Sequence, residues 1–169
     1  GNIHISGNLS STTGTLTNTS NSSINNETNV NVQKYAALAP DGTFSAVKVN
    51  SATSSSQFKF VALHSPTGDT SNVQTKTISC FLKAGEETTA SMFASQSGNL
   101  GAVFTLTGDG SFTVTGGSEN TARITKADNG WYRCEITNNN KSGETYRIGV
   151  GNGAINTNTI AAGNGIYAW

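Results

Sequence analysis

The sequence predicts an all-β protein in which antiparallel strands form a sandwich or a barrel. Short runs rich in β-branched and aromatic residues recur along the chain, as at residues 58–63, 77–82 and 103–106. Turn signals built from Gly, Asn and Asp separate these runs at intervals of about ten residues, a spacing typical of sandwiches and barrels. No stretch keeps a helical hydrophobic period. The 169 residues are enough for one sizeable core.

Residues 1–33 form a segment of different composition, rich in Ser, Thr and Asn. Its only carboxylate is Glu27, it has no Lys or Arg, and it has too little apolar surface to fold alone. One interpretation is a linker or tail. The other is an extended arm that adds strands to a neighbouring subunit. The assembly interface would then include four alternating apolar residues, Ile3, Ile5, Val30 and Val32. We expect the sandwich to occupy residues 34–169.

Charge and hydropathy exclude several partners. Asp, Glu, Lys and Arg make up only 12% of the chain, and ten acidic and ten basic residues give a net charge of zero. Such a chain offers no electrostatic attraction for nucleic acid or for an anionic membrane, so neither partner is expected. No apolar run approaches the roughly 20 residues that span a bilayer, and no signal-peptide pattern begins the sequence. We expect a mature, soluble chain on an outer surface, such as a cell wall, a secreted scaffold or a virus particle.

The sequence argues against an enzyme. Its two histidines lie in polar or loop sequence, and no motif pairs either of them with a nucleophile. Glu86 and Glu87 follow a predicted turn and do not form the facing carboxylates of a glycoside hydrolase. No cofactor is expected. Structural calcium is the one metal for which the loops at Asp41 and Asp109 have suitable oxygen ligands.

The predicted strand at 131–136 contains the main candidates for ligand binding. Alternation turns three of its residues to the core, Tyr132, Cys134 and Ile136. The opposite face then carries Trp131, Arg133 and Glu135. A Trp beside an Arg and a Glu suits stacking against a sugar ring while hydrogen bonds hold the sugar hydroxyls. Alternatively, a second layer or a neighbouring subunit covers Trp131.

Three further aromatic residues have the same two interpretations. Tyr146 is a candidate for ligand binding, and Tyr167 and Trp169 near the end of the sequence are candidates for an assembly interface. An aromatic side chain with a polar tip serves either purpose.

Cys80 and Cys134 form one disulfide or remain two buried thiols, and their separation in sequence does not decide between these. The pattern Asp128-x-Gly130-x-Tyr132-x-Cys134 resembles strand F of immunoglobulin variable-type domains, and the region of Cys80 resembles their strand B. This resemblance implies a Cys80–Cys134 disulfide. The family's core Trp, about a dozen residues after the first cysteine, has no counterpart at residues 91–94.

A second resemblance covers the chain from about Asn29 to the end. Four motifs occur in the order found in jelly-roll modules of bacteriophage virion proteins, which are similar to carbohydrate-binding modules of the concanavalin-like type. The motifs are Ala39-Pro40-Asp41-Gly42-Thr43, Ser79-Cys80-Phe81-Leu82-Lys83-Ala84-Gly85, Asn129-Gly130-Trp131-Tyr132-Arg133-Cys134 and Gly165-Ile166-Tyr167-Ala168-Trp169. In that family the last motif continues beyond its Trp, so we expect this chain to end inside it.

This resemblance implies an antiparallel β-sandwich of jelly-roll type with an N-terminal extended arm, located in a tail fibre, head fibre or capsid decoration. It implies a non-catalytic role in adhesion or in binding cell-surface polysaccharide, with other virion subunits as partners. A homo-oligomer, and a trimer in particular, would suit such a part. The rival hypothesis is a purely structural assembly subunit whose arm pairs with a neighbour. An immunoglobulin-like adhesion domain is the third.

Overall fold

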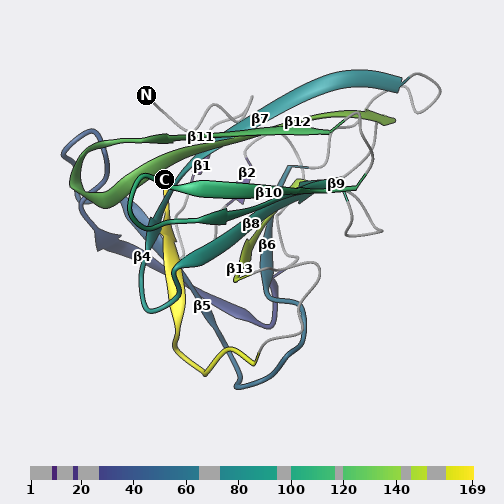
Figure 1. Cartoon of the computed structure of the whole chain (residues 1–169). Helices are drawn as coiled ribbons and strands as arrows, with labels where there is room; N and C mark the ends of the chain where they lie inside the picture. Colours follow the sequence, from purple (N-terminus) through teal and green to yellow (C-terminus); the bar gives the residue numbers. More distant parts are fainter. Residues whose placement is uncertain are drawn as a thin grey trace.

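The computed structural model describes residues 9–10, 17–18, 27–64, 73–94, 100–116, 120–141, 146–151 and 159–169. These residues form two six-stranded antiparallel sheets that face each other (Figure 1). The only helical turn in the described ranges is a short 3-10 turn at Asp128–Gly130. The predicted all-β sandwich is therefore confirmed.

We call the two layers sheet I and sheet II. From edge to edge, sheet I contains β10 (Ser111–Thr115), β9 (Leu100–Thr105), β8 (Thr89–Ala94), β13 (Tyr146–Val150), β6 (Phe60–His64) and β3 (Glu27–Thr28). Sheet II contains β11 (Thr121–Lys126), β12 (Trp131–Lys141), β7 (Val73–Ala84), β14 (Gly165–Ala168), β5 (Ala46–Ser51) and β4 (Val30–Ala37). A separate two-stranded sheet pairs β1 (Leu9–Ser10) with β2 (Thr17–Asn18).

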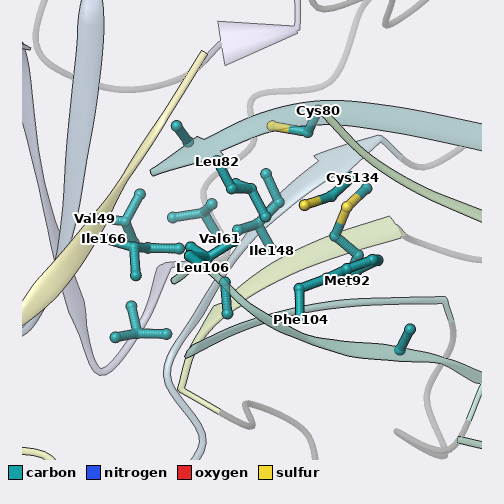
Figure 2. Close-up of a cluster of buried hydrophobic side chains, with 14 of the residues drawn as sticks. Val49, Val61, Cys80, Leu82, Met92, Phe104, Leu106, Cys134, Ile148 and Ile166 are labelled. Carbon is teal, nitrogen blue, oxygen red and sulfur yellow. The ribbon is translucent and has the colours of Figure 1, made fainter. Parts of the chain in front are cut away.

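Alternating side chains from both sheets fill the space between them. Figure 2 shows Leu82 from sheet II with Met92, Phe104 and Ile148 from sheet I, and all four side chains are fully buried. Tyr132, which comes from β12, also belongs to this core, as do Cys134 and Ile136. The predicted parity of β12 is therefore correct, because a period of two turns every second residue to the same face.

The predicted Asn-Gly turn joins β11 to β12. Asn129 and Gly130 both have positive φ angles, of 58° and 78°. Asparagine and glycine adopt this region with the least steric cost, which explains their place in the turn. The Ala127 amide donates to the Trp131 carbonyl at 2.8 Å and closes the turn, so β12 begins at Trp131.

The sandwich begins earlier than residue 34. In β4, Val30 pairs with Ser51 and Val32 with Val49 across the neighbouring strand β5. Val30 is only 6% exposed, and Val32 packs against the same core. Both valines thus serve the core of their own chain, and their placement in a separate arm was wrong. Ile3 and Ile5 lie outside the described residues.

Cys80 and Cys134 are free, buried thiols on adjacent strands of sheet II. Their Cα atoms are direct partners in the pairing of β7 with β12, and Figure 2 shows Cys134 beside Met92 with Cys80 on the neighbouring strand. An immunoglobulin-type disulfide joins two sheets, whereas these cysteines belong to one sheet. The disulfide implied by that resemblance is absent here. Burial raises the pKa of the Cys80 thiol to about 12, which keeps it protonated and unreactive.

Candidate functional site

An open polar surface of the described chain lies on sheet II, over β11, β12 and β7. These strands form the upper side of the sandwich in Figure 1. We call this surface the outer face, and it consists of the side chains that point away from the core. Apart from Trp131, they are Thr121, Arg123 and Thr125 on β11, Arg133, Glu135, Thr137 and Asn139 on β12, and Thr75, Thr77, Ser79, Phe81 and Lys83 on β7.

Arg133 and Glu135 form the centre of the outer face. The Arg133 guanidinium lies 2.9 Å from a Glu135 carboxylate oxygen, and its Nη2 donates to the Ser79 hydroxyl at 3.3 Å. The side chain of Arg133 is 46% exposed, whereas that of Glu135 is 15% exposed. The ion pair therefore holds the guanidinium in place while donor groups remain accessible to solvent.

Paired hydroxyl and amide groups continue the face along the strands. The hydroxyls of Thr77 and Thr137 lie 2.7 Å apart as a cross-strand pair. Two residues further along each strand, the Thr75 hydroxyl donates to the Asn139 amide oxygen at 2.5 Å. Cross-strand hydrogen bonds of this kind keep short polar side chains in fixed positions on the sheet.

Trp131 is buried, so the expectation of an exposed stacking ring was wrong. Its side chain is 0% exposed and its indole Nε1 donates to the Leu38 carbonyl at 3.0 Å. With Ala39 and Ala46 it forms a second apolar cluster on the outer side of sheet II. The segment that follows β4 therefore covers the ring, which confirms the alternative that a second layer lies over it. That layer belongs to the same chain.

The remaining predicted aromatic residues also pack within the chain. The Trp169 indole donates to the Ser45 hydroxyl at 3.0 Å, and its ring centroid lies 5.7 Å from that of Phe81. Tyr167 packs against the same second cluster. The Tyr146 side chain points from β13 into the core and is 2% exposed, so it is not a surface ligand residue. Whether Tyr167 and Trp169 also touch another subunit stays a prediction.

The corresponding face of sheet I is closed at its centre. Ser91 and Phe93 point away from the core by alternation in β8, yet they are only 2% and 4% exposed. The Arg147 guanidinium carbon lies over two rings, 5.0 Å from the Phe60 centroid and 5.9 Å from the Phe93 centroid. Because these side chains are covered, sheet I offers no equivalent polar platform here.

Both loops suggested for calcium have other contacts. The Asp41 carboxylate accepts hydrogen bonds from the Thr43 amide at 2.9 Å and the Thr43 hydroxyl at 2.7 Å, and these bonds lower its pKa. Asp109 lies 3.5 Å from Lys126. Within the described ranges, no three His, Cys, Asp or Glu side chains gather into a group that could hold a metal.

Sequence reasoning missed the neighbours that complete the outer face. It selected Arg133 and Glu135 but not Ser79, Arg123 or Lys83, which the strand pairing brings beside them. Alternation indicates that Arg123 and Lys83 point outward in their own strands. Only the pairing register, which the sequence does not reveal, brings the three strands together.

A scan against protein-family models finds no match to the chain, and a search of the curated proteins finds none either. In the described part of the chain, no helix is long and apolar enough to cross a membrane. The arrangement of the outer face is therefore the main structural guide to function.

Proposed function

We propose that this chain is a non-catalytic module of a virion surface or fibre, and that it binds glycans through the outer face of sheet II. One observation carries the proposal. The half-exposed Arg133 guanidinium is held by Glu135 and Ser79 beside the hydrogen-bonded hydroxyls of Thr77 and Thr137. Fixed donors beside fixed acceptors suit the vicinal hydroxyls of a sugar, because little side-chain entropy is lost when the ligand binds.

Binding is favoured over hydrolysis by the distribution of carboxylates. Glycoside hydrolases place two carboxyl groups about 5–10 Å apart across the scissile bond. Glu135 is the single carboxylate on the described outer face of β11, β12 and β7. Ser79 is the cross-strand partner of Glu135, and Glu86 lies in the bend after β7, which ends at Ala84, five residues and about 17 Å beyond Ser79 along the strand.

The strand orders support a jelly-roll architecture. Sheet II contains the order β12-β7-β14-β5, and sheet I contains the order β9-β8-β13-β6. Both alternate early and late strands, as two interlocked Greek keys do. The virion location is supported by the order of the four sequence motifs. A single sugar site of this kind would bind weakly, and several copies in a homo-oligomer would raise the avidity by roughly 100-fold or more.

Retardation in native gels that contain dextran, polygalacturonate or heparin tests glycan binding. Arg133→Ala removes charge-assisted hydrogen bonds, so its affinity for a retarding polysaccharide should fall about tenfold or more. Lys126→Ala is the control, because Lys126 is exposed and its one ion pair among the described residues is the 3.5 Å contact with Asp109. Retardation of Arg133→Ala equal to that of the unmodified chain would contradict the proposed site.

The second candidate function is a structural assembly subunit. It is favoured by three exposed apolar side chains, Tyr35, Leu38 and Phe44, which are 62%, 48% and 60% exposed. Tyr35 has a φ of 50° at an irregularity in the edge strand β4, and such irregularities also protect edges from uncontrolled pairing. Sedimentation equilibrium should compare the full chain with a chain that begins at Glu27, which keeps β3 and β4. A multimer that becomes a monomer on this truncation would favour assembly through residues 1–26.

A further inference from the structure

The outer face has an excess of positive charge although the chain as a whole is neutral. Its described charged residues on β11, β12 and β7 are three cations and one carboxylate, namely Arg123, Arg133, Lys83 and Glu135. Nearby on β5, Lys48 is neutralised by Glu86 at 2.8 Å. Acidic and basic residues are equal in number over the sequence, so the charges are unevenly distributed over the surface.

The three cations follow a straight diagonal across neighbouring strands. Arg123 lies opposite Glu135 in the strand register, and Arg133 is two residues before Glu135 on β12. Arg133 in turn lies opposite Phe81, and Lys83 is two residues after Phe81 on β7, which is the same direction because the strands are antiparallel. Adjacent strands are about 4.8 Å apart and two residues extend about 6.8 Å, so successive Cα atoms on the diagonal are about 8 Å apart.

Two of the three cations form no ion pair in the part of the chain that the structure describes, although Arg123 lies opposite Glu135 across the strands. They are Arg123, which is exposed, and Lys83. Lys83 Nζ lies over the Trp131 ring, 5.9 Å from its centroid, which orients the ammonium group. Arg133 forms an ion pair with Glu135, but its side chain remains half-exposed. The diagonal therefore presents three positive groups and one neutralising carboxylate to solvent.

We propose that the glycan is an acidic polysaccharide whose carboxylate or sulfate groups bind along the diagonal of Arg123, Arg133 and Lys83. This inference rests on the proposed glycan-binding function. A linear polyanion with repeated charges complements a row of evenly spaced cations. The hydroxyls of Ser79, Thr77 and Thr137 lie beside the row and are suited to the uncharged parts of the sugar units.

A glycan fits this row better than a nucleic acid does. Nucleic-acid sites combine a strongly basic surface with aromatic rings on which bases stack. Here the net charge is zero and Trp131 is covered by its own chain. A row of three cations beside fixed hydroxyls is instead sufficient for a moderately charged sugar polymer.

Calorimetric titration tests the inference with four probes: polygalacturonate, heparin, dextran and single-stranded DNA. We expect polygalacturonate or heparin to bind at least tenfold more tightly than dextran, and the stronger of the two identifies the carboxylate or the sulfate as the preferred group. Arg123→Gln and Lys83→Gln should each weaken this binding at least threefold, and added salt should weaken it further. Lys126→Gln should leave it unchanged, because alternation turns Lys126 to the opposite face of β11 from Arg123 and its ammonium group lies 3.5 Å from Asp109.

The outcomes separate the two proposals. Equal binding of dextran and the acidic polymers, unaffected by the charge substitutions, would overturn the acidic specificity and leave glycan binding intact. Binding of no polysaccharide would overturn both. DNA binding as tight as that of polygalacturonate, with the same sensitivity to Arg123→Gln, would assign the diagonal to nucleic acid instead. Arg123 has no contact with Trp131 to lose, so Arg123→Gln remains informative even if Lys83→Gln destabilises the fold.

Discussion

Replacement of Trp131 by alanine should destabilise the fold and should not act directly on ligand binding. The ring is 0% exposed and packs with Ala39 and Ala46 under the Leu38 carbonyl. Burial of a Trp side chain removes about 150–250 Å² from water, which corresponds to about 4–6 kcal/mol at 25 cal/mol per Å². Measured Trp→Ala costs are about 3–5 kcal/mol, and we expect a loss in that range. A domain of this size is stable by only about 5–15 kcal/mol, so much of its stability would be lost.

Urea unfolding followed by far-ultraviolet circular dichroism measures this loss without relying on tryptophan emission. Trp131→Phe keeps most of the apolar volume but removes the indole donor to Leu38, so it should cost about 1–3 kcal/mol. Phe44→Ala is the matched control, because Phe44 is 60% exposed and its removal should cost less than about 0.5 kcal/mol. A Trp131→Ala chain with unchanged stability and abolished polysaccharide binding would refute the assignment of this ring to the fold.

Three further predictions concern the thiols, an ion pair and a glycine. Cys80 and Cys134 should resist alkylation at pH 8 in the folded chain, because burial raises the pKa of both thiols, and both should react in denaturant without prior reduction; mass spectrometry would show zero and two adducts, and a failure to react in denaturant would instead indicate a disulfide. The hydrogen bond from Lys48 lowers the pKa of Glu86 from 4.5, so this carboxylate stabilises the fold above that pH and the effect is lost as the pH falls through the folded-state pKa. Glu86→Gln should therefore lower the free energy of unfolding by less than about 1 kcal/mol at pH 7, seen as a slightly lower Tm, and should leave the Tm unchanged near pH 2. An equal loss at both pH values would contradict this. Gly101→Ala should prevent correct pairing of β8 with β9, because its Cβ would lie 2.1 Å from the Met92 carbonyl oxygen, whereas Gly42→Ala, with φ of 83° and no atom within 4 Å, should cost only about 1–2 kcal/mol in a thermal melt.

Local patterns were sufficient to predict the fold class and the parity of β12. Alternation depends only on the period of a strand, so the inward direction of Tyr132 and the outward direction of Arg133 could be predicted from the sequence. The burial of Trp131 could not, because the atoms that cover it come from residues 37–46, far away in sequence. An outward-pointing side chain is exposed only where no other segment crosses the sheet.

Register and strand partners also lay beyond sequence reasoning. The composition of residues 27–33 resembles a disordered tail, yet pairing with β5 and β6 places Val30 in the core. The position of Cys80 opposite Cys134 is likewise a property of the register between β7 and β12. Whether such a polar edge segment forms a strand depends on the strand beside it, and the composition of the segment alone does not show that neighbour.

An NMR titration of the amide-labelled full chain with polygalacturonate oligomers would locate glycan binding on the outer face of sheet II residue by residue. We predict that the largest shifts fall on residues 75–83, 121–126 and 131–139, with Arg133 and Arg123 among the most affected. Shifts confined to Tyr35, Leu38 and Phe44 would move the binding surface to the segment that covers Trp131. No shift with polygalacturonate, heparin or dextran fragments would contradict glycan binding by this face and favour the structural assembly role.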